Sequence, residues 1–65
     1  EITERVWFLR AREFHLRTSE WWIWFDMRDS LEEHLRRYRL FLQSVPREHV
    51  QEYIDLRPAD RVVYR

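Results

Sequence analysis

A small set of titratable side chains are the strongest candidates for chemistry in this sequence. Asp26 and Asp29 lie three positions apart and could act as a paired general acid and base. The three histidines, His15, His34 and His49, titrate nearest neutral pH and are common metal ligands. No two of them show the i,i+4 spacing of helical metal ligands. We therefore expect surface or rim histidines, an Asp29 that caps a helix and an Asp26 that is simply solvated.

Missing residue types exclude most catalytic motifs. The 65-residue chain contains no glycine and no cysteine. Phosphate-binding loops, dinucleotide fingerprints, nucleophile elbows and EF-hand loops all depend on glycine. Thiol catalysis, disulfides and cysteine-based zinc sites all depend on cysteine. The sequence thus predicts a protein that is not an enzyme, with no cofactor and no metal.

The charge pattern argues against nucleic acid and membrane partners. Twelve basic residues, all arginine, balance twelve acidic residues, so the formal net charge is zero. A nucleic-acid binder concentrates its cations on one face, whereas the one basic cluster here, Arg36, Arg37 and Arg39, lies among acidic neighbours. The longest apolar run, Trp21–Phe25, is far shorter than the roughly 20 residues of a membrane span. We expect a protein partner or self-association instead.

Aromatic side chains make up 17% of the chain and include four tryptophans. Strand-like alternation in the run Trp21–Phe25 separates Trp22 and Trp24 from Trp21, Ile23 and Phe25. A single helix cannot cover both faces of a sheet, so one of these two sets has to face outward, where it forms a partner surface. The sequence leaves open which set is buried. Trp22 and Trp24 are retained as candidate partner-binding residues.

The clearest helix runs from Leu31 to Gln43. Ser30, with Glu33 three positions on, has the spacing of a capping box. Leu31, Leu35, Tyr38 and Leu42 fall close to one line on the helix, with His34, Phe41 and Val45 beside them, and this stripe is predicted to face the core.

On the opposite side of this helix, Glu32–Arg36 and Glu33–Arg37 are predicted ion pairs at i,i+4 spacing. Leu40 is the one apolar side chain on that polar face. It is therefore a third candidate for a partner surface.

Segments rich in aromatic and β-branched residues flank the helix and predict strands. They are 6–9, 13–17 and 21–25 before the helix, and 52–57 and 61–65 after it. A helix over residues 4–17 is the alternative for the first part of the chain. Without glycine, the turns between strands are expected to be wider than two residues.

These elements predict one α+β domain over residues 1–65. The expected architecture has two layers, with an antiparallel sheet in β-β-β-α-β-β order and one long helix packed on one face. Phe14, Leu16, Ile54 and Leu56 are expected to face that helix.

Residues 53–57, Tyr-Ile-Asp-Leu-Arg, follow the leucine-bearing helix and precede a short turn and a last strand of apolar residues. In this order of elements, residues 30–65 resemble the C-terminal β-domain of the FtsQ/DivIB bacterial cell-division proteins. The turn here is Pro58-Ala59-Asp60, where that family usually carries glycine or asparagine.

The resemblance implies an extracytoplasmic, non-enzymatic scaffold that recruits cell-division partners by adding a strand to its final strand. It places Val62, Val63 and Tyr64 at the docking edge. An artificial origin is the alternative hypothesis, namely a designed or heavily redesigned stable fold without a natural biochemical function. The missing glycine and the use of arginine alone as the basic residue motivate it.

Overall fold

Five strands and one long helix follow one another in β-β-β-α-β-β order in the computed structural model, which describes residues 2–65. The elements are β1 Ile2–Phe8, β2 Glu13–Thr18, β3 Trp22–Asp26, α1 Leu31–Ser44, a short 3-10 turn η1 Arg47–His49, β4 Tyr53–Asp55 and β5 Val63–Tyr64. The predicted order and the small α+β class are confirmed. Residues 4–17 form two strands joined by a turn, not a helix.

The strands lie in the sheet in the same order as in the chain, β1-β2-β3-β4-β5. All neighbours are antiparallel except β3 and β4, which run parallel with Ile23 beside Ile54. The sheet is therefore mixed, which corrects the prediction of a purely antiparallel sheet. The physical reason is α1, because a helical crossover between adjacent strands returns the chain to the end from which the first strand started.

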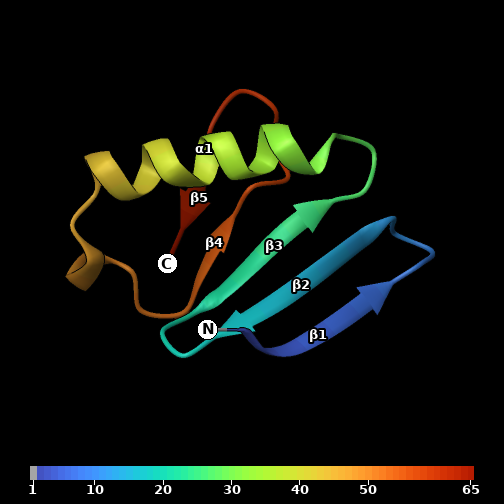
Figure 1. Cartoon of the computed structure of the whole chain (residues 1–65), viewed down its shortest axis with the longest axis horizontal. Helices are drawn as coiled ribbons and strands as arrows, with labels where there is room; N and C mark the ends of the chain where they lie inside the picture. Colours follow the sequence, from blue (N-terminus) through green and yellow to red (C-terminus); the bar gives the residue numbers. More distant parts are fainter. Residues whose placement is uncertain (1) are drawn as a thin grey trace.

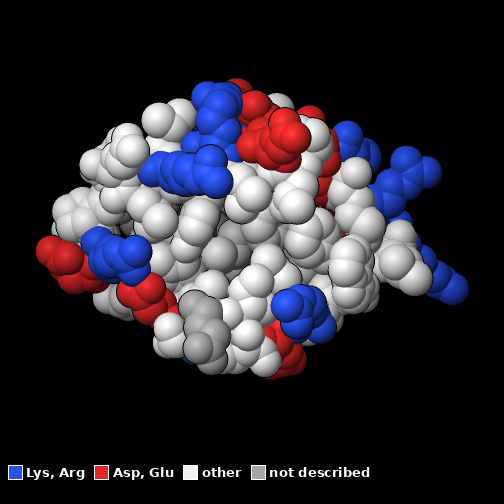
Figure 2. Space-filling model, viewed as in Figure 1, with Lys and Arg blue, Asp and Glu red and all other residues white. Residues whose placement is uncertain are grey.

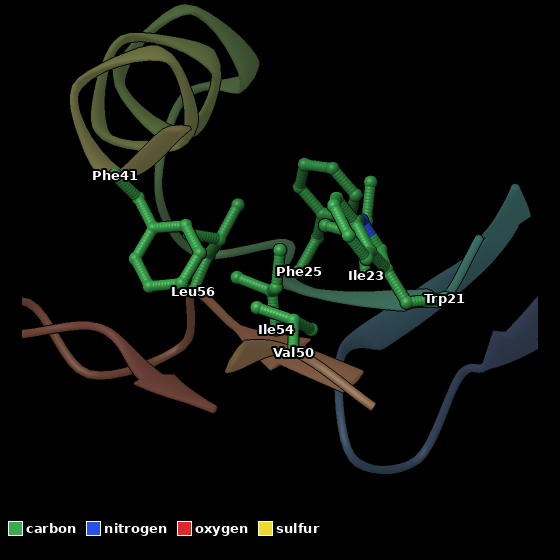
Figure 3. Packing of buried hydrophobic residues seen from close by; sticks show 7 residues of the cluster. All are labelled: Trp21, Ile23, Phe25, Phe41, Val50, Ile54 and Leu56. Atoms are coloured by element: carbon green, nitrogen blue, oxygen red, sulfur yellow. The ribbon is translucent and has the colours of Figure 1, made fainter. Parts of the chain in front are cut away.

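The core lies between α1 and one face of the sheet (Figure 1, Figure 3). Trp21, Ile23 and Phe25 point into it, so the alternation that the sequence left open is resolved in favour of this set. Phe41 reaches in from the helix, and the remaining buried apolar residues are Val50, Ile54 and Leu56. Phe14 and Leu16 pack against this cluster from β2, which confirms the side predicted for them.

The helix is rotated about its axis relative to the sequence prediction. Its buried residues are His34, Arg37 and Phe41, whereas Leu31, at the start of the predicted stripe, is 54% exposed. His34 and Phe41, predicted beside the stripe, are buried, and Tyr38 and Leu42 pack against the edge of the core, so the contact is shifted toward the His34–Phe41 side. The cause is polar anchoring, since His34 bonds to the end of β3 and Arg37 bonds to the turn after β4.

The start of α1 follows the predicted cap. Ser30 accepts a hydrogen bond at its Oγ from the Glu33 N–H at 3.1 Å, which satisfies one of the free amides of the first turn. The Glu33 carboxylate binds Arg36, with Oε1 2.9 Å from Arg36 Nε, and it also forms the predicted ion pair with Arg37, whose Nε is 3.9 Å from Oε2. Arg37 nevertheless turns its guanidinium toward the sheet, where the side chain is buried.

The turn between β1 and β2 spans four residues, Leu9 to Arg12, as expected for a chain without glycine. Arg12 takes the left-handed backbone conformation that glycine usually supplies, with φ of 55°. Its carbonyl accepts the Met27 N–H at 2.7 Å. This bond ties the hairpin turn to the loop that follows β3.

Candidate functional site

The face of the sheet opposite α1 carries a row of stacked rings across four strands. Trp24 lies between Tyr53, at 4.0 Å between ring centroids, and His15, at 5.0 Å. Phe8 continues the row on the other side of His15 at 4.6 Å. Trp22 lies on the same face, with the Arg17 guanidinium 5.9 Å from its ring centre. The two candidate tryptophans, Trp22 and Trp24, are therefore half-buried. Neighbouring side chains of the sheet cover part of each ring, on a face that α1 does not cover.

Arg57 joins this aromatic row to the charged groups beside it. Its guanidinium lies 4.9 Å from the centre of the Trp24 ring. It donates to both oxygens of Asp55, at 2.8 and 2.7 Å, and to the carboxylate of Glu13 on β2 at 2.9 Å. These hydrogen bonds raise the pKa of Arg57. One side chain thus fastens β2, β3 and β4 together on the outer face.

His15 lies in the middle of the same row. Burial lowers its pKa, against the opposing effect of Glu13, whose carboxylate oxygen is 3.6 Å from His15 Nε2. That nitrogen has no hydrogen-bond partner among the described residues. The imidazole is therefore held in the stack chiefly by its ring contacts with Trp24 and Phe8. Of the three histidines expected at the surface or rim, His49 is exposed and His15 half-buried, whereas His34 is fully buried in the core.

A separate apolar groove lies beside the last strand, on the helix side of the molecule. Leu40 and Phe41 of α1 form one wall, and Ala59 to Val62 form the other, around a volume of about 360 Å³. Tyr64 packs its ring edge-on against Phe41 at 5.1 Å. Leu40 is 49% exposed, which confirms its predicted outward position.

The structure thus divides the six candidate residues between two places. Leu40, Val62 and Tyr64 come together at the groove beside β5, because Val62 and Tyr64 alternate onto the helix side of the sheet. Val63 pairs with Asp55 and belongs to the other face, as do Trp22 and Trp24.

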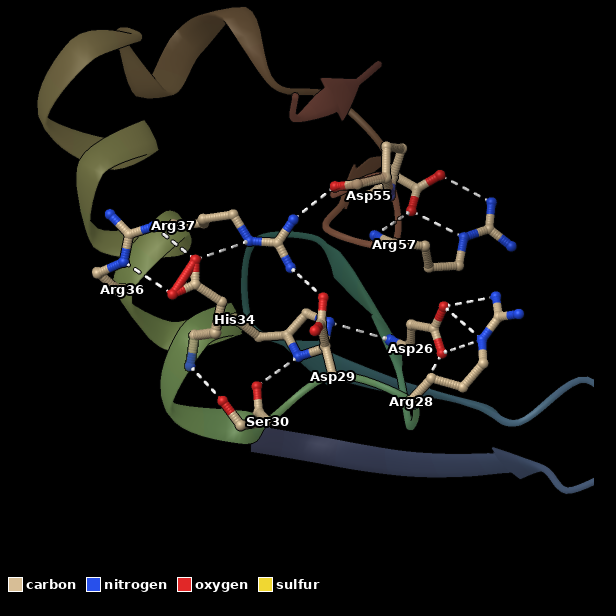
Figure 4. Close-up of polar contacts among 11 residues, drawn as sticks. Asp26, Arg28, Asp29, Ser30, His34, Arg36, Arg37, Asp55 and Arg57 are labelled. Atoms are coloured by element: carbon tan, nitrogen blue, oxygen red, sulfur yellow. Dashed lines mark hydrogen bonds and ion pairs between the residues drawn. The ribbon is translucent and has the colours of Figure 1, made fainter. Parts of the chain in front are cut away.

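Arg37 positions the outer wall of this groove. It is a buried arginine that donates through Nη1 to the carbonyl of Pro58 and through Nη2 to Asp29 at 3.4 Å (Figure 4). Its Nε has no hydrogen-bond partner among residues 2–65. Arg37 thereby holds the 58–62 segment against α1, while Asp29 pairs with it instead of capping the helix.

The carboxylates at the ends of the two parallel strands are held in the same way. Asp26 accepts from the backbone N–H of Arg28 at 2.8 Å and from its guanidinium at 3.0, 3.1 and 2.7 Å. Asp55 repeats this arrangement with Arg57 two residues later. Asp26 is therefore a buried carboxylate, not the solvated one that was expected. Both of its oxygens are hydrogen-bonded to Arg28, an arrangement that suits a structural ion pair (Figure 4).

Acid is expected to weaken the fold through Asp26. Its hydrogen bonds to Arg28 lower its pKa from the ordinary 3.8 to about 2. A lowered pKa stabilises the folded state above pH 4, and this contribution is lost as the pH falls from about 4 to about 2. We expect a loss of about 1–2 kcal/mol in the free energy of unfolding over that range, a reduced value because Arg28 is largely exposed. Urea unfolding at several pH values measures it.

The matched control for this titration is Asp26→Asn, which cannot ionise. Its stability is expected to fall less steeply between pH 4 and pH 2 than that of the unchanged chain. Equal slopes in the two proteins would contradict the role given to Asp26.

The polar partners of His34 and the burial of Arg37 are the positioning features that the sequence analysis missed. His34 accepts the Asp26 N–H at Nε2 (3.3 Å) and lies 2.9 Å through Nδ1 from the Ser30 carbonyl, so it joins β3 to the start of α1. One signal was visible in the sequence: an aspartate followed two residues later by an arginine closes both β3 and β4. No comparable pattern marks the helix residues.

Among residues 2–65, no helix is long and apolar enough to cross a membrane. The same part of the chain contains no cluster of three or more histidine, aspartate or glutamate residues that could hold a metal ion. Side chains of both charge signs are interspersed on the face shown in Figure 2, with uncharged groups across its centre.

Comparison with known proteins gives no relative: no protein-family model, curated protein or solved structure matches the chain.

Proposed function

We propose that this chain is a non-enzymatic protein-binding module that receives an extended segment of its partner along β5. The observation that carries the proposal is the apolar groove between Leu40 and Val62, directly beside a strand with an open edge. Partner segments that add to a sheet gain affinity from backbone hydrogen bonds and specificity from pockets for alternate side chains. This chain offers both features side by side.

The backbone pairing of β5 identifies the groups available to a partner. Arg65 and Tyr53 exchange backbone hydrogen bonds in both directions, at 3.0 and 3.1 Å. Residues along an antiparallel strand alternate in direction, so Val63 bonds inward to Asp55. The N–H and C=O groups of Val62 and Tyr64 consequently point away from the sheet. A partner strand would bond to these two residues and place an apolar side chain in the groove.

The resemblance to the FtsQ/DivIB β-domain supports the same surface. The resemblance implies recruitment through the final strand, which follows the Asp-Leu-Arg strand; the two correspond to β5 and β4 here. The class of partner we propose is therefore a cell-division membrane protein with an extended segment. Trp22 and Trp24 provide a secondary contact surface on the opposite face.

Tyr64→Pro and Leu40→Asp test this proposal in quantitative pull-down against cell-division membrane proteins. Proline at position 64 removes an outward N–H without breaking a bond to β4, because an edge strand tolerates proline where the N–H faces solvent. Each variant is expected to weaken binding about tenfold, which corresponds to one lost hydrogen bond or one lost apolar contact.

Two matched controls separate the groove from general effects. Tyr64→Phe keeps the outward amide, and Leu31→Asp changes an equally exposed leucine of the same helix that lies outside the groove. Both are expected to bind like the unchanged chain. Unaltered binding in Tyr64→Pro and Leu40→Asp would refute the proposed docking edge.

A further inference from the structure

The opposite edge of the sheet is both open and apolar. β1 pairs with β2 on one side only, and the helix lies over the far strands, away from it (Figure 1). Trp7 on this strand is 58% exposed and Leu9, just after it, is 76% exposed; Ile2 and Phe8 are exposed as well. An open edge of this kind is a template for pairing with another strand.

Hydrogen bonds inside the sheet show which backbone groups of β1 remain free. Thr18 N–H donates to the Trp21 carbonyl at 2.9 Å, so Thr18 bonds to the β3 side. Because the backbone N–H and C=O groups of successive β2 residues point alternately to the two sides, every second residue bonds to β3 and the residues between them bond to β1. The β2 residues that bond to β1 are paired with Glu4, Val6 and Phe8. The N–H and C=O groups of Arg5 and Trp7 are therefore directed outward.

From this edge we infer that the chain forms a symmetric dimer, in which β1 pairs antiparallel with β1 of a second copy about a two-fold axis at Val6. In a symmetric pair each residue meets its counterpart at equal distance from the axis. An axis at Val6 brings the outward backbone groups of Arg5 in each copy opposite those of Trp7 in the other copy, so this pairing occurs two times in the dimer. The neighbouring choice, an axis at Arg5, would set two arginines directly opposite, which is unfavourable.

The side chains suit the same register. Arg5 and Trp7 lie on the helix side of the sheet, where Trp7 stacks on Phe14 at 4.9 Å. Across the two-fold axis, each guanidinium would face the indole of the other copy, an attractive cation–π contact. On the outer face Val6 meets Val6 and Glu4 meets Phe8, so no like charges are opposed. The occupant of this edge is thus a second copy, and this inference does not depend on the groove beside β5.

Variants at Val6 test the register directly by sedimentation across a concentration series. Val6→Lys and Val6→Glu each place two like charges opposite one another at the axis, and each is expected to raise the dimer dissociation constant at least tenfold. An equimolar mixture of the two variants pairs opposite charges and is expected to dimerise again. Near-ultraviolet circular dichroism of the tryptophans checks that each variant is folded.

Two further variants place the contact on this edge. Arg5→Pro removes an outward amide and is expected to abolish the dimer, whereas Arg5→Ala loses only the cation–π contacts and weakens it about tenfold. Tyr64→Pro, which tests the β5 edge, is expected to leave the dimer unchanged. The dimer at β1 and the partner site at β5 can therefore be refuted independently of each other. A chain that stays monomeric at every concentration, or Val6 variants that stay monomeric when mixed, would overturn the inference.

Discussion

Replacing Trp21 with alanine is expected to cost about 3–5 kcal/mol of the free energy of unfolding. The indole is 2% exposed, packs in the core and donates through Nε1 to the Tyr38 hydroxyl at 3.3 Å. A domain of this size gains only about 3–5 kcal/mol from its core, so the variant is expected to be largely unfolded. Far-ultraviolet circular dichroism and urea titration measure the loss.

The adjacent Trp22 supplies the matched comparison. It has the same side chain one position along the strand, but it lies half-buried on the outer face beside Arg17. Trp22→Ala is expected to cost about 1–2 kcal/mol, in proportion to the smaller area that it buries. Equal losses at the two positions would contradict the assignment of Trp21 to the core and Trp22 to the uncovered face.

The second large effect is expected for Arg57→Leu, at about 2–3 kcal/mol. The change leaves the buried Asp55 carboxylate and the Glu13 carboxylate of β2 without the guanidinium that neutralises both. It also removes the cation above the Trp24 ring. The free energy of unfolding from urea titration at neutral pH is the measurement.

A second substitution identifies the cause of that loss. Asp55→Asn in the Arg57→Leu chain removes the unpaired charge and is expected to recover part of the stability. Arg61→Leu is the control, because Arg61 and its partner Asp60 are both exposed and 3.6 Å apart, and such a pair contributes little. If Arg57→Leu costs no more than Arg61→Leu, the network across β2, β3 and β4 is not stabilising.

The sorting of the aromatic side chains into two sets shows why part of this fold can be predicted from sequence, although the structure was needed to decide which set is buried. Alternation in Trp21–Phe25 and in Tyr53–Arg57 is a local property of extended chains, and it sorts side chains onto two faces before any packing is known. The helix cap at Ser30 is local as well, since it joins residues three positions apart. These features appear in the structure as predicted.

The rotation of α1 shows where local patterns fail. Leu31 begins the predicted apolar line, yet it is 54% exposed, whereas Arg37, which the pattern assigned to the polar side, is buried. The bonds responsible reach from His34 to Asp26 and from Arg37 to Pro58, which is 21 positions away. Helical periodicity ranks side chains by polarity and carries no information about such distant polar partners.

The sequence alone determined the order of the elements, the helix cap at Ser30 and the sorting of strand side chains onto two faces. Tertiary structure alone decided that β3 and β4 are parallel, that Leu40 meets Val62 in a groove beside β5, and that β1 forms the other open edge. The physical reason is that strand order and groove walls arise from contacts between segments far apart in the chain. Those contacts depend on how the helix crosses the sheet, which no local spacing records.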